Sequence, residues 1–208
     1  MSPRAARAAL QGQQTREAVL DAAMDLFGRR GYRGCSLAQI AERAGIGQSG
    51  LLHHFGSKEQ LLQEVLYEHY PLSASRTDIQ AIAAGRTTFP AEIRRVTQAN
   101  LQNPTLVRFF SVMAGESLTD GHPVQEFFAT RNARLRETFG AAVASGMGLA
   151  GEAGRERISL IVATTFATMD GLQMQWLREP EVVDLTAGVE LIARMIDLEL
   201  AAVSKEFG

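Results

Sequence analysis

The sequence has little cysteine and few aromatic residues, and it contains no long apolar run. Cys35 is the single cysteine, so an internal disulfide is excluded, and this fits a reducing environment. Apolar runs stay below the ~18 residues that a membrane span needs. The first residues lack the apolar core of a signal peptide. We therefore expect a cytoplasmic protein without a membrane partner.

Patterns typical of enzymes and metal sites are also missing. His53 and His54 are neighbours on one predicted helix, so they point in different directions and do not form an i, i+4 metal pair. His69 and His122 have no partner at metal-binding spacing. The sequence has no phosphate-binding glycine loop, no Gly-x-Ser-x-Gly elbow and no cysteine pair. We expect no enzymatic activity, no metal and no cofactor.

Strand patterns are absent as well, because no stretch keeps a period-two alternation of apolar and polar residues. With 208 residues and 46% hydrophobic content, the chain is long enough for one or two domains with a real core. The pattern predicts an all-α protein. Helices are expected at about 58–70 (ended by Pro71), 89–101, from Asn103-Pro104 to Ala114, from His122-Pro123 to 143, at 155–178 and at 184–204.

Charge is divided unevenly along the chain, although the net charge is only −2. Residues 1–58 contain eight Lys and Arg against four acidic residues, a net of +4, and the remaining residues carry a net of −6. A basic N-terminal part on an acidic body is typical of a DNA-facing domain joined to a regulatory domain. Residues 1–13 show no clear cap or apolar stripe and are expected to form a mobile arm.

The segment from Ser36 to Lys58 predicts two short helices joined by a tight turn. Ser36 is a good N-cap, and Gly45 follows the first helix at the position that favours a left-handed residue. A second helix from about Gln48 to Phe55 is expected to turn Leu51, Leu52 and Phe55 inward. This is the helix-turn-helix pattern, whose second helix lies in the major groove of DNA.

Motifs on both sides of this segment carry a resemblance to a known family. They are a helix ending in Leu26-Phe27, then Gly31-Tyr32, Ser-Leu-x-x-Ile-Ala from Ser36, Ala-Gly-Ile from Ala44, and His-Phe-x-Ser-Lys-Glu-x-Leu from His54. Over about residues 15–66 the chain resembles the DNA-binding domain of the tetracycline-repressor (TetR) family. Family members often carry Tyr where this chain has Leu52, and that Tyr typically touches the DNA backbone, so the chain departs from the family pattern at this position.

The pattern and the resemblance together predict a division into a DNA-binding domain at 1–58 and a regulatory and dimerisation domain at 59–208. The partner of the first is double-stranded DNA with a palindromic operator. Exposed residues of the second helix would read bases, with Gln48 best suited to adenine, and neighbouring residues would contact phosphates. The predicted DNA-binding residues are Thr15, Ser36, Arg43, Gln48, Ser49, Gly50, His53, His54 and Lys58.

The last two long helices are expected to form a homodimer. Residues 158–177 are apolar around most of the helix, and such a helix is buried on more than one side. The resemblance implies dimerisation through these helices, and completion of a monomeric core is the alternative. The predicted interface residues are Met174, Leu177, Val189, Ile192 and Ile196.

The resemblance also implies that a small inducer binds among the middle helices. Phenylalanine and methionine adapt to varied apolar ligands, although the same residues suit an ordinary core. The predicted ligand-binding residues are Phe109, Phe110, Met113, Phe127, Phe128, Phe166, Met169, Gln173 and Met174. The predicted function is a ligand-responsive repressor released from its operator by a mostly apolar molecule. The alternative is a helical adaptor that acts through protein partners without specific DNA binding.

Overall fold

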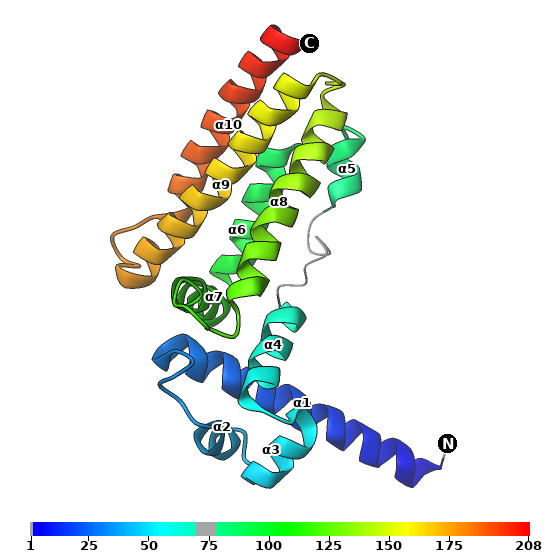
Figure 1. The fold of residues 1–208 in the computed structure, drawn as a ribbon, viewed down its shortest axis with the longest axis vertical. Helices are drawn as coiled ribbons and strands as arrows, with labels where there is room; N and C mark the ends of the chain where they lie inside the picture. The colour runs from blue at the N-terminus through cyan, green and yellow to red at the C-terminus, as the bar shows by residue number, and fades with distance from the viewer. Residues whose placement is uncertain (1, 70–77) are drawn as a thin grey trace. The chain divides into compact units, whose positions relative to one another are not determined.

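The structure is a computed structural model that describes residues 2–69 and 78–208. Over those ranges the protein is all-α, as predicted, and no strand occurs (Figure 1). The expected break at Pro71 lies outside the described residues. The helices are α1 (Pro3–Arg30), α2 (Leu37–Arg43), α3 (Gln48–Phe55), α4 (Lys58–His69), α5 (Ile79–Ala83), α6 (Phe89–Leu101), α7 (Pro104–Glu116), α8 (Gln125–Gly146), α9 (Glu152–Arg178) and α10 (Leu185–Phe207).

The chain forms two compact units, and one of them is discontinuous in sequence. The first unit joins Met1–Pro71 to the later segment Arg108–Gln125, and the second contains Leu72–Val107 and Glu126–Gly208. Helix α7 therefore contributes most of its length to the first unit. The predicted division at residue 58 remains a prediction about function.

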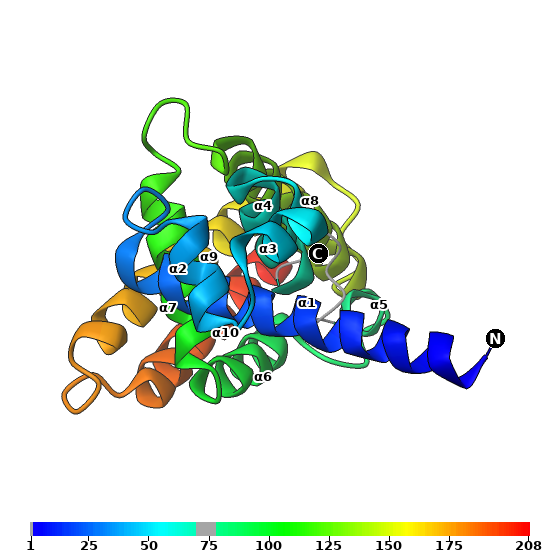
Figure 2. The ribbon, with the colours of Figure 1, turned by 90° about the horizontal axis from the view of Figure 1, so that it is seen from below.

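Helix α1 is the support on which the first unit is built. Its C-terminal half buries Val19 and Phe27 completely, while α2, α3 and α4 contribute Ile40, Leu51 and Leu61 to the same core. Figure 2 shows the N-terminal half of α1 extending beyond these three helices. Burying such side chains contributes ~1.5–3 kcal/mol each, so this small unit holds its helix-turn-helix segment firmly.

Residues 1–13, expected as a mobile arm without a clear cap, include the beginning of α1, which starts at Pro3 and has a cap. The Ser2 side chain accepts a hydrogen bond from the backbone N–H of Ala5, 3.3 Å away, and so caps the helix. Proline at the first helical position has a suitable φ and gives up only an N–H that would be unpaired there. This cap was not predicted from the sequence.

The segment Arg108–Gln125 closes the first unit where α1 ends. Phe109 is fully buried, and its ring centroid lies 6.5 Å from that of Phe27. Gly28 permits this approach, because a Cβ at that position would lie 3.1 Å from the backbone of Phe109. Close contact between α1 and α7 therefore depends on glycine at this point of α1.

The second unit has a core shared by α6, α8, α9 and α10, which run alongside one another in Figure 1. The ring centroid of Phe166 on α9 lies 5.3 Å from the ring centroid of Phe139 on α8 and 6.2 Å from that of Phe89 on α6. At the surface, Arg94 Nε lies 2.9 Å from Glu190 Oε1 and links α6 to α10. Aromatic contacts inside the unit and an ion pair at its edge thus join its helices.

Candidate functional site

The helix-turn-helix geometry begins with a reciprocal cap at Ser36. Ser36 Oγ accepts from the backbone N–H of Gln39 at 3.3 Å, and Gln39 Oε1 accepts from the backbone N–H of Ser36 at 2.9 Å. Gly45 ends α2 with φ at +71°, a conformation that other residues rarely adopt. The turn that follows fixes the start of α3.

Helix α3 buries one side and exposes the other. Leu51 and Phe55 face the core, whereas Gln48, Ser49, His53 and His54 are exposed and Gly50 is half-buried. The expectation that Leu52 points inward is wrong, since its side chain is 38% exposed. The helical period explains this, because Leu52 is one residue past Leu51 and so is turned about 100° from the buried stripe.

Lys58 lies at the start of α4, behind the exposed face of α3. Ser57 caps that start, because its Oγ accepts from the backbone N–H of Gln60 at 3.1 Å. The first N–H groups of a helix attract anions. Lys58 adds a positive side chain at the same helix N-terminus. Lys58 Nζ lies 4.3 Å from the centroid of the Tyr32 ring. Sequence spacing did not indicate this contact, because Tyr32 lies in the turn after α1 and Lys58 begins α4, far apart in the chain.

Thr15 and Arg43, the outer members of the predicted DNA-binding set, already have partners inside the protein. Thr15 Oγ1 donates to the carbonyl oxygen of Gln11 at 2.9 Å. Arg43 Nη2 lies 2.7 Å from Asp25 Oδ2, and Arg29 Nε lies 2.6 Å from the other oxygen of that carboxylate. Arg43 remains half exposed, so its guanidinium can still meet a phosphate.

The predicted ligand-binding residues divide between the two compact units. Phe109, Phe110 and Met113 are buried in the first unit, whereas the other six residues belong to the second. Within the second unit, the Phe127 and Phe128 rings contact each other edge to face at 5.3 Å. Met174 is 38% exposed, so it does not line an enclosed site in the subunit.

Polar side chains on α9 differ in how they are satisfied. Thr165 Oγ1 and Thr168 Oγ1 each donate to a carbonyl oxygen one turn earlier at 2.8 Å, so they serve their own helix. Burial raises the pKa of Asp170, and the positive charge of Arg131 only partly opposes this. Gln173 is buried one turn further along. Helix α9 thus carries two polar side chains, those of Asp170 and Gln173, at partly buried and buried positions.

The α10 residues predicted for the dimer interface lie in the subunit's own core. Val189, Ile192 and Ile196 are 2%, 7% and 3% exposed. A different stripe stays open, formed by Leu191, Met195 and Leu198, and Leu160 of α9 is also exposed. The pattern identified α10 as apolar but did not show which of its two apolar sides the subunit would cover.

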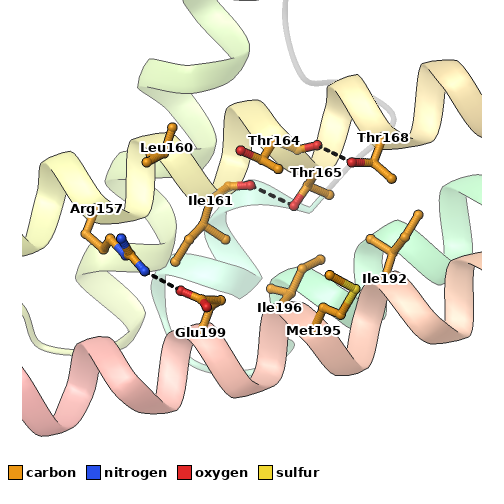
Figure 3. A pocket seen from close by; sticks show the side chains of 10 residues that line it. All are labelled: Arg157, Leu160, Ile161, Thr164, Thr165, Thr168, Ile192, Met195, Ile196 and Glu199. Atoms are coloured by element: carbon orange, nitrogen blue, oxygen red, sulfur yellow. Dashed lines mark hydrogen bonds and ion pairs between the residues drawn. The ribbon is translucent and has the colours of Figure 1, made fainter.

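A groove of about 290 Å³ lies between α9 and α10. In Figure 3, Met195 and Ile196 rise from α10 toward α9, and Arg157 of α9 pairs with Glu199 of α10 at 2.7 Å. The groove shares Leu160 and Met195 with the open apolar residues described above. It is thus part of the exposed α9–α10 face. Its lining residues are Arg157, Leu160, Ile161, Thr164, Thr165, Thr168, Ile192, Met195, Ile196 and Glu199.

No group of three His, Cys, Asp or Glu side chains suited to a metal occurs within residues 2–69 and 78–208. None of the helices formed by the described part of the chain has the length and apolar character needed to cross a membrane.

Two family models match the chain. Residues 19–65 match the description "Bacterial regulatory proteins, tetR family", and residues 90–201 match "BetI-type transcriptional repressor, C-terminal". The first covers the helix-turn-helix segment with the C-terminal part of α1 and most of α4, and the second covers α6 to most of α10.

Similar proteins are also transcriptional regulators. The chain is 42% identical over 74 residues to the HTH-type transcriptional regulator RutR of Escherichia coli K12, over 33% of this chain and 35% of RutR. The match thus spans about a third of that relative's length. This chain is also 28% identical to the HTH-type transcriptional regulator BetI of Brucella anthropi, over 89% of this chain and 93% of BetI.

Solved structures share the fold. NalD, the secondary repressor of the MexAB-OprM multidrug efflux pump in Pseudomonas aeruginosa, aligns with a TM-score of 0.70 and 21% identity, over 91% of this chain and 96% of NalD. A complex of SmeT with triclosan aligns with a TM-score of 0.68 and 22% identity, over 90% of each chain.

Proposed function

Because this chain belongs to the tetR family of bacterial regulatory proteins, we propose that it represses transcription as a homodimer on a palindromic operator and leaves DNA when a small ligand binds. The observation that carries the DNA-binding part is the exposed face of α3, held by the capped turn after α2 and followed by Lys58 at the start of α4. A helix held in this way is suited to the major groove.

The residues of this face divide into two roles. Gln48, Ser49, Gly50, His53 and His54 lie on α3 and are proposed to read bases, with the Gln48 amide able to pair with adenine through two hydrogen bonds. Phosphate contacts come from Lys58 and Ser36, with Thr15 and Arg43 at the edge of the surface. Phosphate contacts supply affinity and salt dependence, whereas base contacts supply sequence discrimination.

Selection of genomic fragments tests DNA binding, followed by affinity measurements at several salt concentrations. Lys58→Ala should weaken binding to all sequences and lower the salt slope by about one unit. Lys205→Ala is the matched control, because Lys205 is the other lysine of the chain and is exposed on α10. Gln48→Ala should instead cost ~1–3 kcal/mol at one base pair. If no palindromic fragment is enriched at low salt, the adaptor function is favoured over repression.

The exposed face of α9 and α10 supports the homodimer. Leu160, Leu191, Met195 and Leu198 leave apolar surface uncovered on neighbouring helices, and a twofold-related copy would cover it with the same surface. Met174 and Leu177 of the predicted set lie on α9 and remain at least partly exposed. The dimer must present two α3 helices about one turn of DNA apart, ~34–36 Å.

The inducer is proposed to bind in the second unit beside α9. Its apolar part would contact residues such as Phe166 and Met169, and a hydrogen-bonding group would meet Asp170 or Gln173. Phe127 and Phe128 are further candidates for the lining, whereas Phe109, Phe110 and Met113 support the first unit. A ligand shifts the DNA-binding equilibrium only by its different affinity for the two states, typically ~1–3 kcal/mol.

A pair of glutamine variants tests the ligand site. Operator affinity and melting temperature are measured with a library of mostly apolar compounds. Gln173→Leu should abolish or change the response to an active compound, because the buried amide is lost. Gln175→Leu is the control, since Gln175 is exposed two residues further along α9. If no compound changes operator affinity or melting temperature, the protein is a constitutive DNA binder.

A further inference from the structure

We propose that Glu116 and His122, which lie outside the helix-turn-helix segment, position Lys58 for its phosphate contact through the ring of Tyr32. This inference rests on the proposed DNA binding and adds two positioning residues to it. Both belong to the segment Arg108–Gln125, which forms one compact unit with the first helices.

The Glu116 carboxylate holds Tyr32 by its backbone. The N–H of Tyr32 donates to Glu116 Oε2 at 2.8 Å across a partly buried contact. Such a hydrogen bond to a charged acceptor is stronger than one between neutral groups. It fixes the backbone directly after α1, at the residue that carries the aromatic ring.

Gly31 lets the carboxylate come this close. Its φ is +71°, and a Cβ at that position would collide with Glu116 Oε1. Any other residue would therefore meet a backbone penalty, and its Cβ would displace the Glu116 carboxylate from this position. The glycine, the carboxylate and the Tyr32 N–H form one fitted arrangement.

His122 contacts the Tyr32 ring and lies close to the same carboxylate. Its side chain is 3% exposed, and its Nε2 lies 3.3 Å from the same Glu116 oxygen. The backbone N–H of Val124 donates to His122 Nδ1 at 3.4 Å, while Nε2 approaches the Glu116 carboxylate without forming a hydrogen bond. The imidazole and Tyr32 rings meet edge to face with centroids 5.3 Å apart.

Lys58 rests on the ring that these contacts hold in place. Its Nζ lies 4.3 Å from the Tyr32 centroid, within the ~6 Å range of a cation–π contact. A lysine side chain is long and flexible, so binding a phosphate normally orders it at an entropic cost. An ammonium already kept near the N-terminus of α4 loses less freedom when it meets DNA. Glu116 and His122 thereby act on DNA affinity without touching DNA.

Lysine-selective ¹³C labelling observes this arrangement without DNA. Lys58 and Lys205 are the lysines of the chain, so the ε-methylene signals are simple to assign. The Tyr32 ring current should move the Lys58 signal upfield of the exposed Lys205 signal. Glu116→Ala should move the Lys58 signal toward that of Lys205, whereas Glu116→Gln should keep it in place, because the amide oxygen can still accept from the Tyr32 N–H. Glu126→Ala, at an exposed glutamate of α8, is the control.

Operator binding then tests the consequence for function. Glu116→Ala should lower affinity on the order of three- to tenfold and lower the salt slope as Lys58→Ala does. The double variant should bind no more weakly than Lys58→Ala alone, because both changes remove one contact. If Glu116→Ala does not fold, Tyr32→Leu replaces it, with the same loss expected.

Two results would overturn the proposal: an unmoved Lys58 signal in Glu116→Ala (in Tyr32→Leu, if that replaces it), or losses of affinity that add up in the double variant. A wild-type protein that binds no specific DNA would instead refute the proposed function. The labelling experiment would even then show whether Glu116 holds the lysine, so the two failures can be told apart.

Discussion

Leu198→Ala is the most direct test of the open α9–α10 face. Leu198 is 72% exposed in the subunit, and full burial of a leucine contributes ~1.5–3 kcal/mol. Covering the remaining surface in a dimer is therefore worth roughly 1–2 kcal/mol for each copy. In a twofold-symmetric dimer both copies carry the substitution, so the loss of association free energy counts twice. We therefore expect the dissociation constant of the dimer to rise about 30- to 700-fold.

Sedimentation equilibrium at several protein concentrations measures this change. Leu10→Ala is the matched control, because Leu10 is also an exposed helical leucine, at 61%, but lies on α1. Ile192→Ala provides a second comparison. Ile192 is 7% exposed, so its truncation should lower the melting temperature of the subunit more than it weakens association. Wild-type-like association of Leu198→Ala, or an equal loss in Leu10→Ala, would refute the assignment of this face.

Three further predictions concern stability and reactivity. Burial raises the pKa of Asp170, so ionisation of this carboxyl opposes folding. Asp170→Asn should therefore raise the melting temperature at neutral pH but not at a pH below the ordinary carboxyl pKa. A gain in melting temperature that persists in acid would contradict this. Burial, as the dominant cause, also raises the pKa of Cys35, so iodoacetamide should label the native thiol slowly and the unfolded thiol fast. Gly28→Ala should destabilise by ~1–3 kcal/mol in urea, because its Cβ would lie 3.1 Å from the Phe109 backbone, whereas Gly12→Ala, with nothing within 4 Å, should stabilise by ~0.5–1 kcal/mol.

Local rules predicted the helix-turn-helix segment well. The cap at Ser36, the left-handed Gly45 and the buried Leu51 and Phe55 all involve residues close in sequence, where spacing alone restricts geometry. Leu52 was misplaced because it is turned about 100° from Leu51, and the sequence does not show how wide the buried side of α3 is. The same local signals would have shown Ser2 and Pro3 as a helix start.

Long-range arrangement was the harder part. Helix α10 is apolar on two sides, and its sequence does not show that Ile192 is covered by the subunit while Met195 is left open. The pairing of Phe109 with Phe27 likewise joins segments far apart in the chain. Residues predicted as one ligand site therefore divide between two compact units.

The discontinuous first unit has a consequence for engineering hybrid regulators. A chimaera that exchanges only residues 1–58 would take Gly31 and Tyr32 from one parent and Glu116 and Phe109 from the other. Its transplanted module would then have an unmatched surface at the end of α1. Exchanging Met1–Pro71 together with Arg108–Gln125 transfers the whole compact unit, and these crossover points keep Gly31, Tyr32 and Glu116 from the same parent.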